Sequence, residues 1–114
     1  MPPKNNPLKL NPLQLRTLTL LQEFAGDPEV GRALPESGEV EIDGVPHPHG
    51  DHFHVGHSVV MARDASGLHN ESVWKALDRK GLIRSTFPNR IVLTREGLAY
   101  DTGLREAILH RSSH

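Results

Sequence analysis

The chain has no cysteine among its 114 residues. This absence excludes disulfides, thiolate zinc sites and cysteine nucleophiles, and it fits a reducing compartment. The sequence also lacks any apolar run near the roughly 20 residues that a membrane-spanning helix needs, and its N-terminal stretch MPPKNNPLKL contains no apolar signal region. No nucleophile motif, phosphate-binding loop or cofactor fingerprint is present. We therefore expect a soluble, cytoplasmic protein that is not an enzyme.

The charges are segregated along the sequence, although the net charge is only −1. Residues 22–58 carry eight acidic residues against one arginine, whereas residues 63–95 carry seven basic residues against three acidic ones. Such asymmetry is typical of a protein with a polyanion-binding half. The competing interpretation is an ordinary scatter of charges over a solvated surface.

The N-terminal part of the chain predicts an arm followed by one helix. Residues 1–10 are rich in proline and asparagine, so we expect a disordered arm there. Asn11 is a good helix N-cap and Pro12 suits the first helical position. Apolar residues then recur at helical spacing as far as Gly26, which is a natural stop. A loop or a single short turn is expected over residues 27–37.

The middle of the chain predicts short strands around a histidine-rich connection. Apolar residues alternate with acidic ones in GEVEIDG, residues 38–44, which indicates a short, half-buried strand. The histidine-rich connection occupies residues 45–57. We expect a strand at 52–56 and a short helix at about 57–65.

The second half of the chain predicts a helix, a hairpin and a last helix. Asn70 can cap a helix from Glu71 to Lys80, with Trp74 at the edge of its apolar stripe and therefore expected in the core rather than in a stacking role. Two short β-prone runs follow, joined by a tight turn at 87–90. Thr94 then caps a last helix, which is expected to extend over residues 95–111.

This second half resembles the end of a winged helix-turn-helix domain of the MarR-type and related transcriptional regulators. In that family a recognition helix ends in a leucine, a few charged residues and Gly-Leu-Ile, a β-hairpin wing follows, and the wing leads into Leu-Thr-x-x-Gly. The likeness covers roughly residues 57–109 and is sharp over 73–98, with matches at Leu77, Gly81, Leu82, Ile83, Leu93, Thr94 and Gly97. It implies an α+β winged helix, with three or more helices and a small antiparallel β-hairpin wing, as a single domain over residues 11–111.

The resemblance also implies a function and a set of binding residues. The helix at 70–80 would enter the major groove of double-stranded DNA, and the chain would be a DNA-binding transcriptional regulator. Related regulators are dimers, so a homodimer contact is expected through Leu8, Leu10, Leu18, Leu104 and Ile108. The residues expected to reach bases or phosphates are His69, Asn70, Ser72, Lys75 and Arg79 on the helix, with Arg84 and Arg90 flanking the wing.

The same fold has a competing use as a protein-interaction module, because a fold does not by itself determine function. Glu71 and Asp78 lie on the candidate recognition helix and would repel DNA phosphates. Both uses remain open from the sequence.

The stretch HPHGDHFHVGH holds five of the eight histidines. His52 and His54 are two residues apart, so on a strand they would share a face and could chelate Zn²⁺, Ni²⁺ or Cu²⁺. His47, His49 or His57 could complete a tetrahedral set. A response to pH is a further alternative, because imidazoles lie beside many carboxylates here. Our default expectation is a polar connection with no dedicated ligand and no cofactor.

A metal titration tests the histidine stretch. If it forms a dedicated site, replacing both His52 and His54 by alanine will weaken the binding of Zn²⁺ or Ni²⁺, because the chelating pair is lost. Isothermal titration calorimetry of the wild type and the double variant measures this difference. Equal, weak binding by the two proteins would contradict a dedicated metal site.

Overall fold

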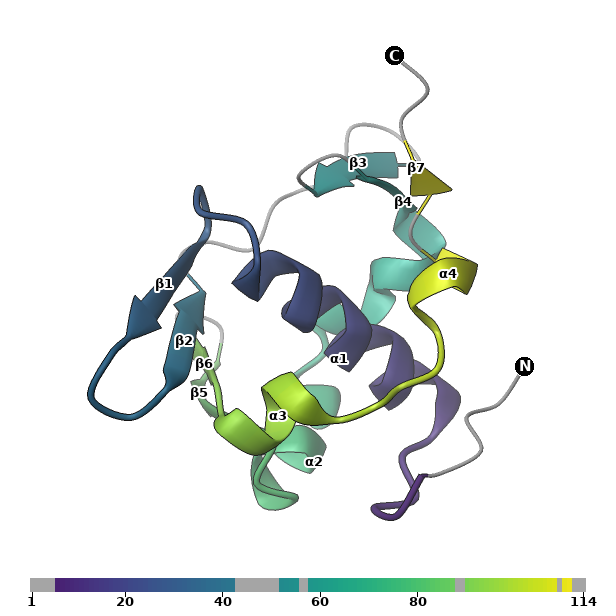
Figure 1. The fold of residues 1–114 in the computed structure, drawn as a ribbon. Helices are drawn as coiled ribbons and strands as arrows, with labels where there is room; N and C mark the ends of the chain where they lie inside the picture. Colours follow the sequence, from purple (N-terminus) through teal and green to yellow (C-terminus); the bar gives the residue numbers. More distant parts are fainter. Residues whose placement is uncertain (1–5, 43–51, 56–57, 88–89, 109, 112–114) are drawn as a thin grey trace.

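Helix α1 (Pro12–Ala25) lies at the centre of the molecule, surrounded by the other elements (Figure 1). The computed structural model describes residues 6–42, 52–55, 58–87, 90–108 and 110–111. Seven residues of α1 are buried, and the helix packs against elements within residues 31–42, 62–79 and 90–99. Because it is covered on most of its surface, α1 is the central helix of the core.

The sequence features at the start of α1 act as predicted. The Asn11 side chain accepts a hydrogen bond from the Gln14 backbone N–H at 2.8 Å, and the Gln14 side chain accepts one from the Asn11 N–H at 3.0 Å. These reciprocal bonds form a capping box, which satisfies N–H groups that a helix start leaves unpaired. The helix ends at Ala25 with Gly26 as its C-cap, so the predicted helix is confirmed.

A four-stranded antiparallel sheet lies beside α1. Its strands are β1 (Gly31–Leu34), β2 (Glu39–Ile42), β5 (Ile83–Thr86) and β6 (Arg90–Leu93), in the spatial order β1-β2-β6-β5. Strands β5 and β6, from the second half of the chain, thus complete the sheet that β1 and β2 begin. Ile42, Ile91 and Leu93 are buried on the side that faces the core. The architecture is therefore α+β.

Strand β1 lies in the segment 27–37 predicted to be a loop or a single short turn, and that prediction was wrong over residues 31–34. The sequence of β1, GRAL, shows no alternation of polar and apolar residues, so periodicity gave no signal. The strand exists because it pairs with β2 through a tight turn, in which Gly38 has a positive φ of 75°. The strand predicted at 38–44 is confirmed as β2.

A second, smaller sheet consists of residues 52–55, 58–61 and 110–111, which are strands β3, β4 and β7 in that spatial order. The strand predicted at 52–56 is confirmed as β3 (His52–Val55). The short helix predicted at about 57–65 was wrong at its start, because residues 58–61 form strand β4 (Ser58–Met61). Two adjacent valines favour the extended backbone there, and pairing with β3 satisfies its hydrogen bonds. A 3₁₀ helix, η1 (Ala62–His69), follows β4.

The helix and hairpin predicted in the second half are confirmed. Helix α2 (Glu71–Arg79) begins after Asn70, whose side chain accepts from the Ser72 N–H at 3.0 Å. Gly81 has φ 79°, the left-handed conformation that ends a helix. Strands β5 and β6 then pair as an antiparallel hairpin.

The single last helix predicted over residues 95–111 was wrong. Gly103 adopts φ 69°, a left-handed conformation that interrupts helical geometry between two short helices. The apolar spacing that suggested one helix places Ile108 in the core all the same, after a change of direction. The segment forms α3 (Arg95–Ala99), α4 (Arg105–Ile108) and β7 (His110–Arg111).

Contacts from α1 explain why the chain leaves the helical path after α3. The Gln22 side-chain amide donates to the carbonyls of Gly97 and Tyr100, at 2.8 and 2.7 Å. These bonds satisfy carbonyl groups that the end of a helix leaves free. Farther along, the hydroxyls of Thr19 and Thr102 are hydrogen-bonded at 2.6 Å in the interior. Tertiary hydrogen bonds therefore compete successfully with a continued helix.

The second half of the N-terminal arm, expected to be disordered, packs against the fold. Leu10 is only 4% exposed, and the Leu8 carbonyl accepts a hydrogen bond from Lys80 Nζ at 2.8 Å. The Leu8 N–H in turn donates to the Tyr100 hydroxyl at 3.3 Å. The arm is held because its two leucines cover the core.

Three of the five apolar residues expected at a dimer contact are core residues instead. Leu10, Leu18 and Ile108 are buried within a single chain, and Leu8 and Leu104 are partly buried against the same cluster. Leu10, Leu18 and Ile108 are therefore not available for the expected contact, and a homodimer stays a prediction. No helix in the described part of the chain is long and apolar enough to cross a membrane.

We expect Gly97→Ala to destabilise the protein by about 3 kcal/mol, because the interior cannot accept an added methyl group there. A Cβ at Gly97 would lie 2.0 Å from the Leu82 carbonyl oxygen, a backbone atom that cannot move aside. Gly26→Ala is the matched control, since the nearest atom to its Cβ would be 3.6 Å away. That variant should change stability by less than about 1 kcal/mol. Urea denaturation followed by circular dichroism measures both, and equal stabilities would contradict the packing argument.

Candidate nucleic-acid interface

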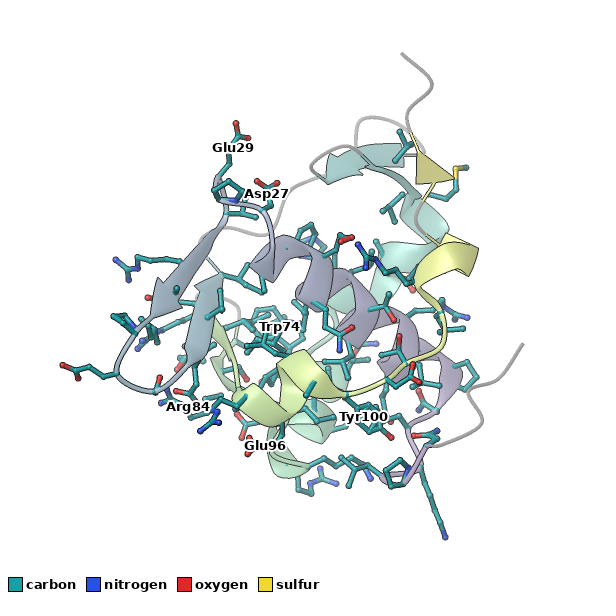
Figure 2. All side chains as sticks on the ribbon, in the orientation of Figure 1. Asp27, Glu29, Trp74, Arg84, Glu96 and Tyr100 are labelled. Carbon is teal, nitrogen blue, oxygen red and sulfur yellow. The ribbon has the colours of Figure 1, made fainter. Side chains whose placement is uncertain are left out.

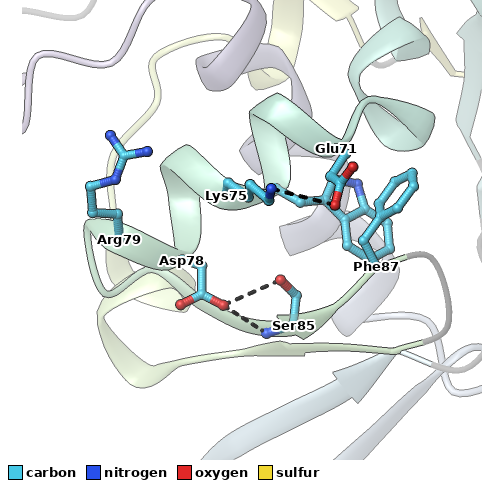
Figure 3. Close-up of a pocket in the computed structure, with 7 residues that line it drawn as sticks. Glu71, Lys75, Asp78, Arg79, Ser85 and Phe87 are labelled. Carbon is cyan, nitrogen blue, oxygen red and sulfur yellow. Dashed lines mark hydrogen bonds and ion pairs between the residues drawn. The ribbon is translucent and has the colours of Figure 1, made fainter.

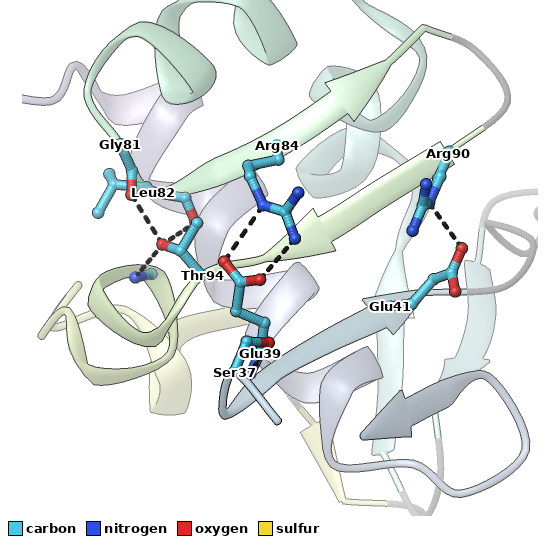
Figure 4. Close-up of polar contacts among 9 residues, drawn as sticks. Ser37, Glu39, Glu41, Gly81, Leu82, Arg84, Arg90 and Thr94 are labelled. Atoms are coloured by element: carbon cyan, nitrogen blue, oxygen red, sulfur yellow. Dashed lines mark hydrogen bonds and ion pairs between the residues drawn. The ribbon is translucent and has the colours of Figure 1, made fainter. Parts of the chain in front are cut away.

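Helix α2 and the β5–β6 hairpin are joined by hydrogen bonds at two points. Asp78 accepts from the backbone N–H and the hydroxyl of Ser85, at 3.0 and 3.3 Å (Figure 3). Where β6 ends, the Thr94 hydroxyl lies 2.7 Å from the Gly81 carbonyl and accepts from the Gly97 N–H at 3.0 Å (Figure 4). The helix, the hairpin and the start of α3 are therefore held in one arrangement.

A shallow groove of about 380 Å³ runs between α2 and β5 (Figure 3). Trp74 and Phe87 form its aromatic part, with ring centroids 4.8 Å apart and planes at 80°. Its charged lining is mixed, with two acidic and two basic side chains from α2. These are Glu71, Lys75, Asp78 and Arg79, with Ser85 opposite.

Trp74 belongs to the core, as predicted. It is 2% exposed, and its indole N–H donates to the Leu68 carbonyl at 3.0 Å. Figure 2 shows it among the packed side chains of the interior, whereas Arg84 lies at the outside of the hairpin. The indole ring of Trp74 is therefore packed at the bottom of the groove and is not free to stack on a base.

The exposed side of α2 carries the helix residues that the resemblance singled out. Ser72, Lys75 and Arg79 are all exposed, and Lys75 and Arg79 are four residues apart and so lie on one stripe of the helix. Lys75 Nζ is 3.6 Å from Glu71, an exposed ion pair that contributes little to stability. Within the described part of the chain, Arg79 makes no ion pair.

Asn70 and His69 lie at the N-terminal end of α2. The Asn70 side chain is engaged as the N-cap of the helix, so its carbonyl oxygen already has a backbone partner. His69 is exposed at the end of η1. The structure therefore brings the five predicted helix residues to one end and one side of α2.

The two wing arginines are ion-paired with glutamates of β2 (Figure 4). Arg84 binds Glu39 through two nitrogens, at 3.2 and 2.5 Å. Arg90 Nε lies 2.8 Å from one oxygen of Glu41, and the other oxygen of Glu41 binds Arg32 of β1. Three arginines thus share two carboxylates on the outer side of the sheet.

The pairing of β2 with β6 creates this cluster. Glu41 is the cross-strand partner of Val92, and Val92 is also the partner of Arg84 on the other side. Cross-strand partners share a face of the sheet, so the acidic and basic side chains alternate across it. Val92 lies between them and is only 2% exposed. Glu39 and Glu41 were not identified from the sequence as partners of the wing arginines, although their alternation with apolar residues in the strand is plain in the sequence.

The arginines shift the pKa values of the carboxyl groups in the cluster. The hydrogen bond from Arg84 lowers the pKa of Glu39 below its ordinary value. The hydrogen bond from Arg32, together with the charge of Arg90, lowers the pKa of Glu41. In return, Glu39 raises the pKa of Arg84. Both carboxylates are therefore charged at neutral pH and remain so into mild acid.

The histidine stretch is only partly covered by the structure. His52 and His54 lie on strand β3, but their side chains are outside what the structure describes, and His47, His49 and His57 lie wholly outside the described residues. Among the side chains that are described, no three histidine, aspartate or glutamate residues are grouped to hold a metal ion. The metal site stays a prediction.

Comparison with known proteins gave no match, whether to a family model, to a curated protein or to a solved structure. The exposed stripe of α2 and Ser85 of β5 line one groove, whereas the paired arginines Arg84 and Arg90 are not part of that lining.

The lowered pKa values of Glu39 and Glu41 predict a loss of stability in acid. A carboxyl group whose pKa is lower in the folded than in the unfolded chain stabilises the fold above its unfolded pKa. That contribution is lost as the pH falls through the lowered folded value. We therefore expect the melting temperature to fall below about pH 4.5, and to fall less steeply in Glu39→Gln/Glu41→Gln.

Glu36→Gln is the matched control for this measurement. Glu36 is exposed in the turn after β1 and has no ion pair in the described part of the chain. Thermal melts between pH 3 and pH 7, a range of about four units around the ordinary carboxyl pKa, compare the three proteins. Parallel curves for wild type and the double variant would show that the cluster does not contribute.

Proposed function

We propose that the chain is a DNA-binding protein of winged-helix type that acts as a regulator of transcription. In this proposal α2 is the recognition helix and enters the major groove of double-stranded DNA, with the β5–β6 hairpin as the wing beside it. The observation that carries the proposal is that one face presents both the exposed stripe of α2 and the hairpin, on the two sides of a single groove.

The order of elements supports the winged-helix assignment. Helix α1, strand β2, η1, α2 and the β5–β6 hairpin follow one another along the chain, and β2 joins the hairpin in one sheet. Only Asn70 separates η1 from α2, so the two short helices form a tight helix-turn-helix-like pair over α1. The β1 strand and the β3–β4 hairpin are additions to that plan.

The chemistry of α2 supports contact with DNA. Arg79 is an exposed guanidinium with no ion pair in the described part of the chain, so a phosphate or a guanine edge can engage it without displacing an acid. Lys75 lies one turn earlier on the same stripe. Ser72, near the N-terminal end, adds a neutral hydroxyl where recognition helices approach base edges.

A protein-interaction module is the second candidate, and the mixed charge of the groove favours it. Glu71 and Asp78 line the groove beside Lys75 and Arg79, and the wing arginines are neutralised by β2. A surface with alternating charges over an aromatic base suits a polar protein partner better than a uniform polyanion.

DNA binding predicts that Arg79→Ala weakens binding to duplex DNA by roughly tenfold, because the guanidinium without an internal partner is lost. Lys75→Ala should weaken it less, roughly threefold, since Lys75 shares its charge with Glu71. Fluorescence anisotropy with labelled duplexes, chosen by an unbiased selection from random sequence, measures these affinities at low salt. The emission of Trp74, the only tryptophan, reports on the groove in the same samples.

Arg105→Ala is the charge-matched control for these variants. Arg105 is also an exposed arginine, but it lies on α4, away from the hairpin in Figure 1. We expect it to bind DNA as the wild type does. If the wild-type chain binds no duplex even at low salt, DNA binding is refuted and the protein-interaction candidate takes its place.

A further inference from the structure

The side chains of the two wing arginines are exposed to solvent, whereas those of their glutamate partners are largely covered. The side chains of Arg84 and Arg90 are 58% and 55% exposed, whereas those of Glu39 and Glu41 are 15% and 11% exposed. The arginines therefore face the solvent from which a polyanion would approach. The carboxylates lie beneath them, on a strand whose position is set by sheet pairing on both edges.

The two-nitrogen contact of Arg84 with Glu39 uses the same fork of donors that binds a phosphate. A phosphate can take this arginine only by displacing the carboxylate or by sharing its donors. Displacement would remove the arginine partner of Glu39 and leave its carboxylate with the Ser37 side chain alone, which is costly for a largely covered charged group. Glu39 is therefore an internal competitor for any phosphate at the wing.

Glu41 holds two arginines from different strands, Arg32 and Arg90. Releasing Arg90 to a phosphate leaves Glu41 with Arg32 alone, so this glutamate is never wholly unpaired. Competition at Arg90 is therefore weaker than at Arg84. The glutamates therefore compete with a phosphate more strongly at Arg84, near the α3 end of the hairpin, than at Arg90.

We propose that Glu39 and Glu41 limit the affinity of the wing for the DNA backbone by occupying Arg84 and Arg90, so that α2 supplies most of the binding. This inference rests on the proposed function. It assigns a role in binding to two acidic residues of β2 that do not themselves contact the nucleic acid. Sequence-independent affinity depends on the number of phosphates that cations neutralise, and the two glutamates lower that number by up to about two.

The test compares DNA binding by the wild type, Glu39→Gln, Glu41→Gln and the double variant. Glutamine has the shape of glutamate without its charge, so each substitution releases guanidinium donors with little change of packing. We expect the affinity for an unrelated duplex at low salt to rise about fivefold for Glu39→Gln and less for Glu41→Gln. The slope of log affinity against log salt should steepen by about one for each released arginine.

Glu23→Gln is the matched control. Glu23 pairs with Arg105 at 3.2 Å, and its substitution changes the net charge by the same amount at a site on α1 and α4. It should raise the affinity less than about twofold and leave the salt slope unchanged. A second control links the gain to one arginine, because Arg84→Gln added to Glu39→Gln should abolish the gain. If the double variant does not fold, the single Glu39→Gln variant, which leaves the Glu41 pairs intact, provides the same test.

The possible outcomes separate the inference from the function on which it rests. A gain in the β2 variants that is absent from Glu23→Gln supports the inference. If the wild type binds DNA and the β2 variants behave as Glu23→Gln does, the inference is overturned and DNA binding stands. If neither the wild type nor any variant binds duplex DNA at low salt, the proposed function fails and the inference fails with it.

Discussion

The pairing of β2 with β6 is the contact on which the rest of the molecule depends. It joins residues 40–42 to residues 91–93, about fifty positions apart, and so turns two hairpins into one sheet. On the inner side it brings Ile42 and Ile91 together against α1, which is how the sheet enters the core. On the outer side it places the acidic residues of β2 beside the basic residues of the hairpin. One ladder of backbone hydrogen bonds thus builds both the core and the charged surface.

The charge of the wing illustrates why local sequence is a poor guide to surface potential. Seven basic residues against three acidic ones over residues 63–95 suggested a positive half. In the fold, Glu39 and Glu41 come from the acidic half and lie within ion-pair distance of Arg84 and Arg90. Acidic residues of one half therefore neutralise basic residues of the other across the β2–β6 pairing, whereas Arg79 on α2 makes no ion pair within the described part of the chain. The surface potential of this face therefore depends on the register of the sheet as much as on the composition of the sequence.

The elements that the sequence predicted well are those whose signals are local. Asn11 and Gln14 cap α1, and Asn70 caps α2, each through hydrogen bonds within a few residues. The errors came where distant partners decided the outcome. Strand β1 has no periodic signal and forms by pairing with β2, and the helix predicted after Thr94 is broken where Gln22 of α1 binds its carbonyls. Of the candidate site, the exposed stripe of α2 was foreseen and the paired state of the wing arginines was not.

The sequence by itself determined the helices α1 and α2, the β5–β6 hairpin and the buried position of Trp74, because caps, turn residues and helical spacing act over a few positions. Only the tertiary structure decided which strand lies beside the hairpin, where the last helix stops and which arginines are already bound. Those features depend on contacts between residues far apart in the chain. Their geometry is set by packing around α1, and no short stretch of sequence encodes it.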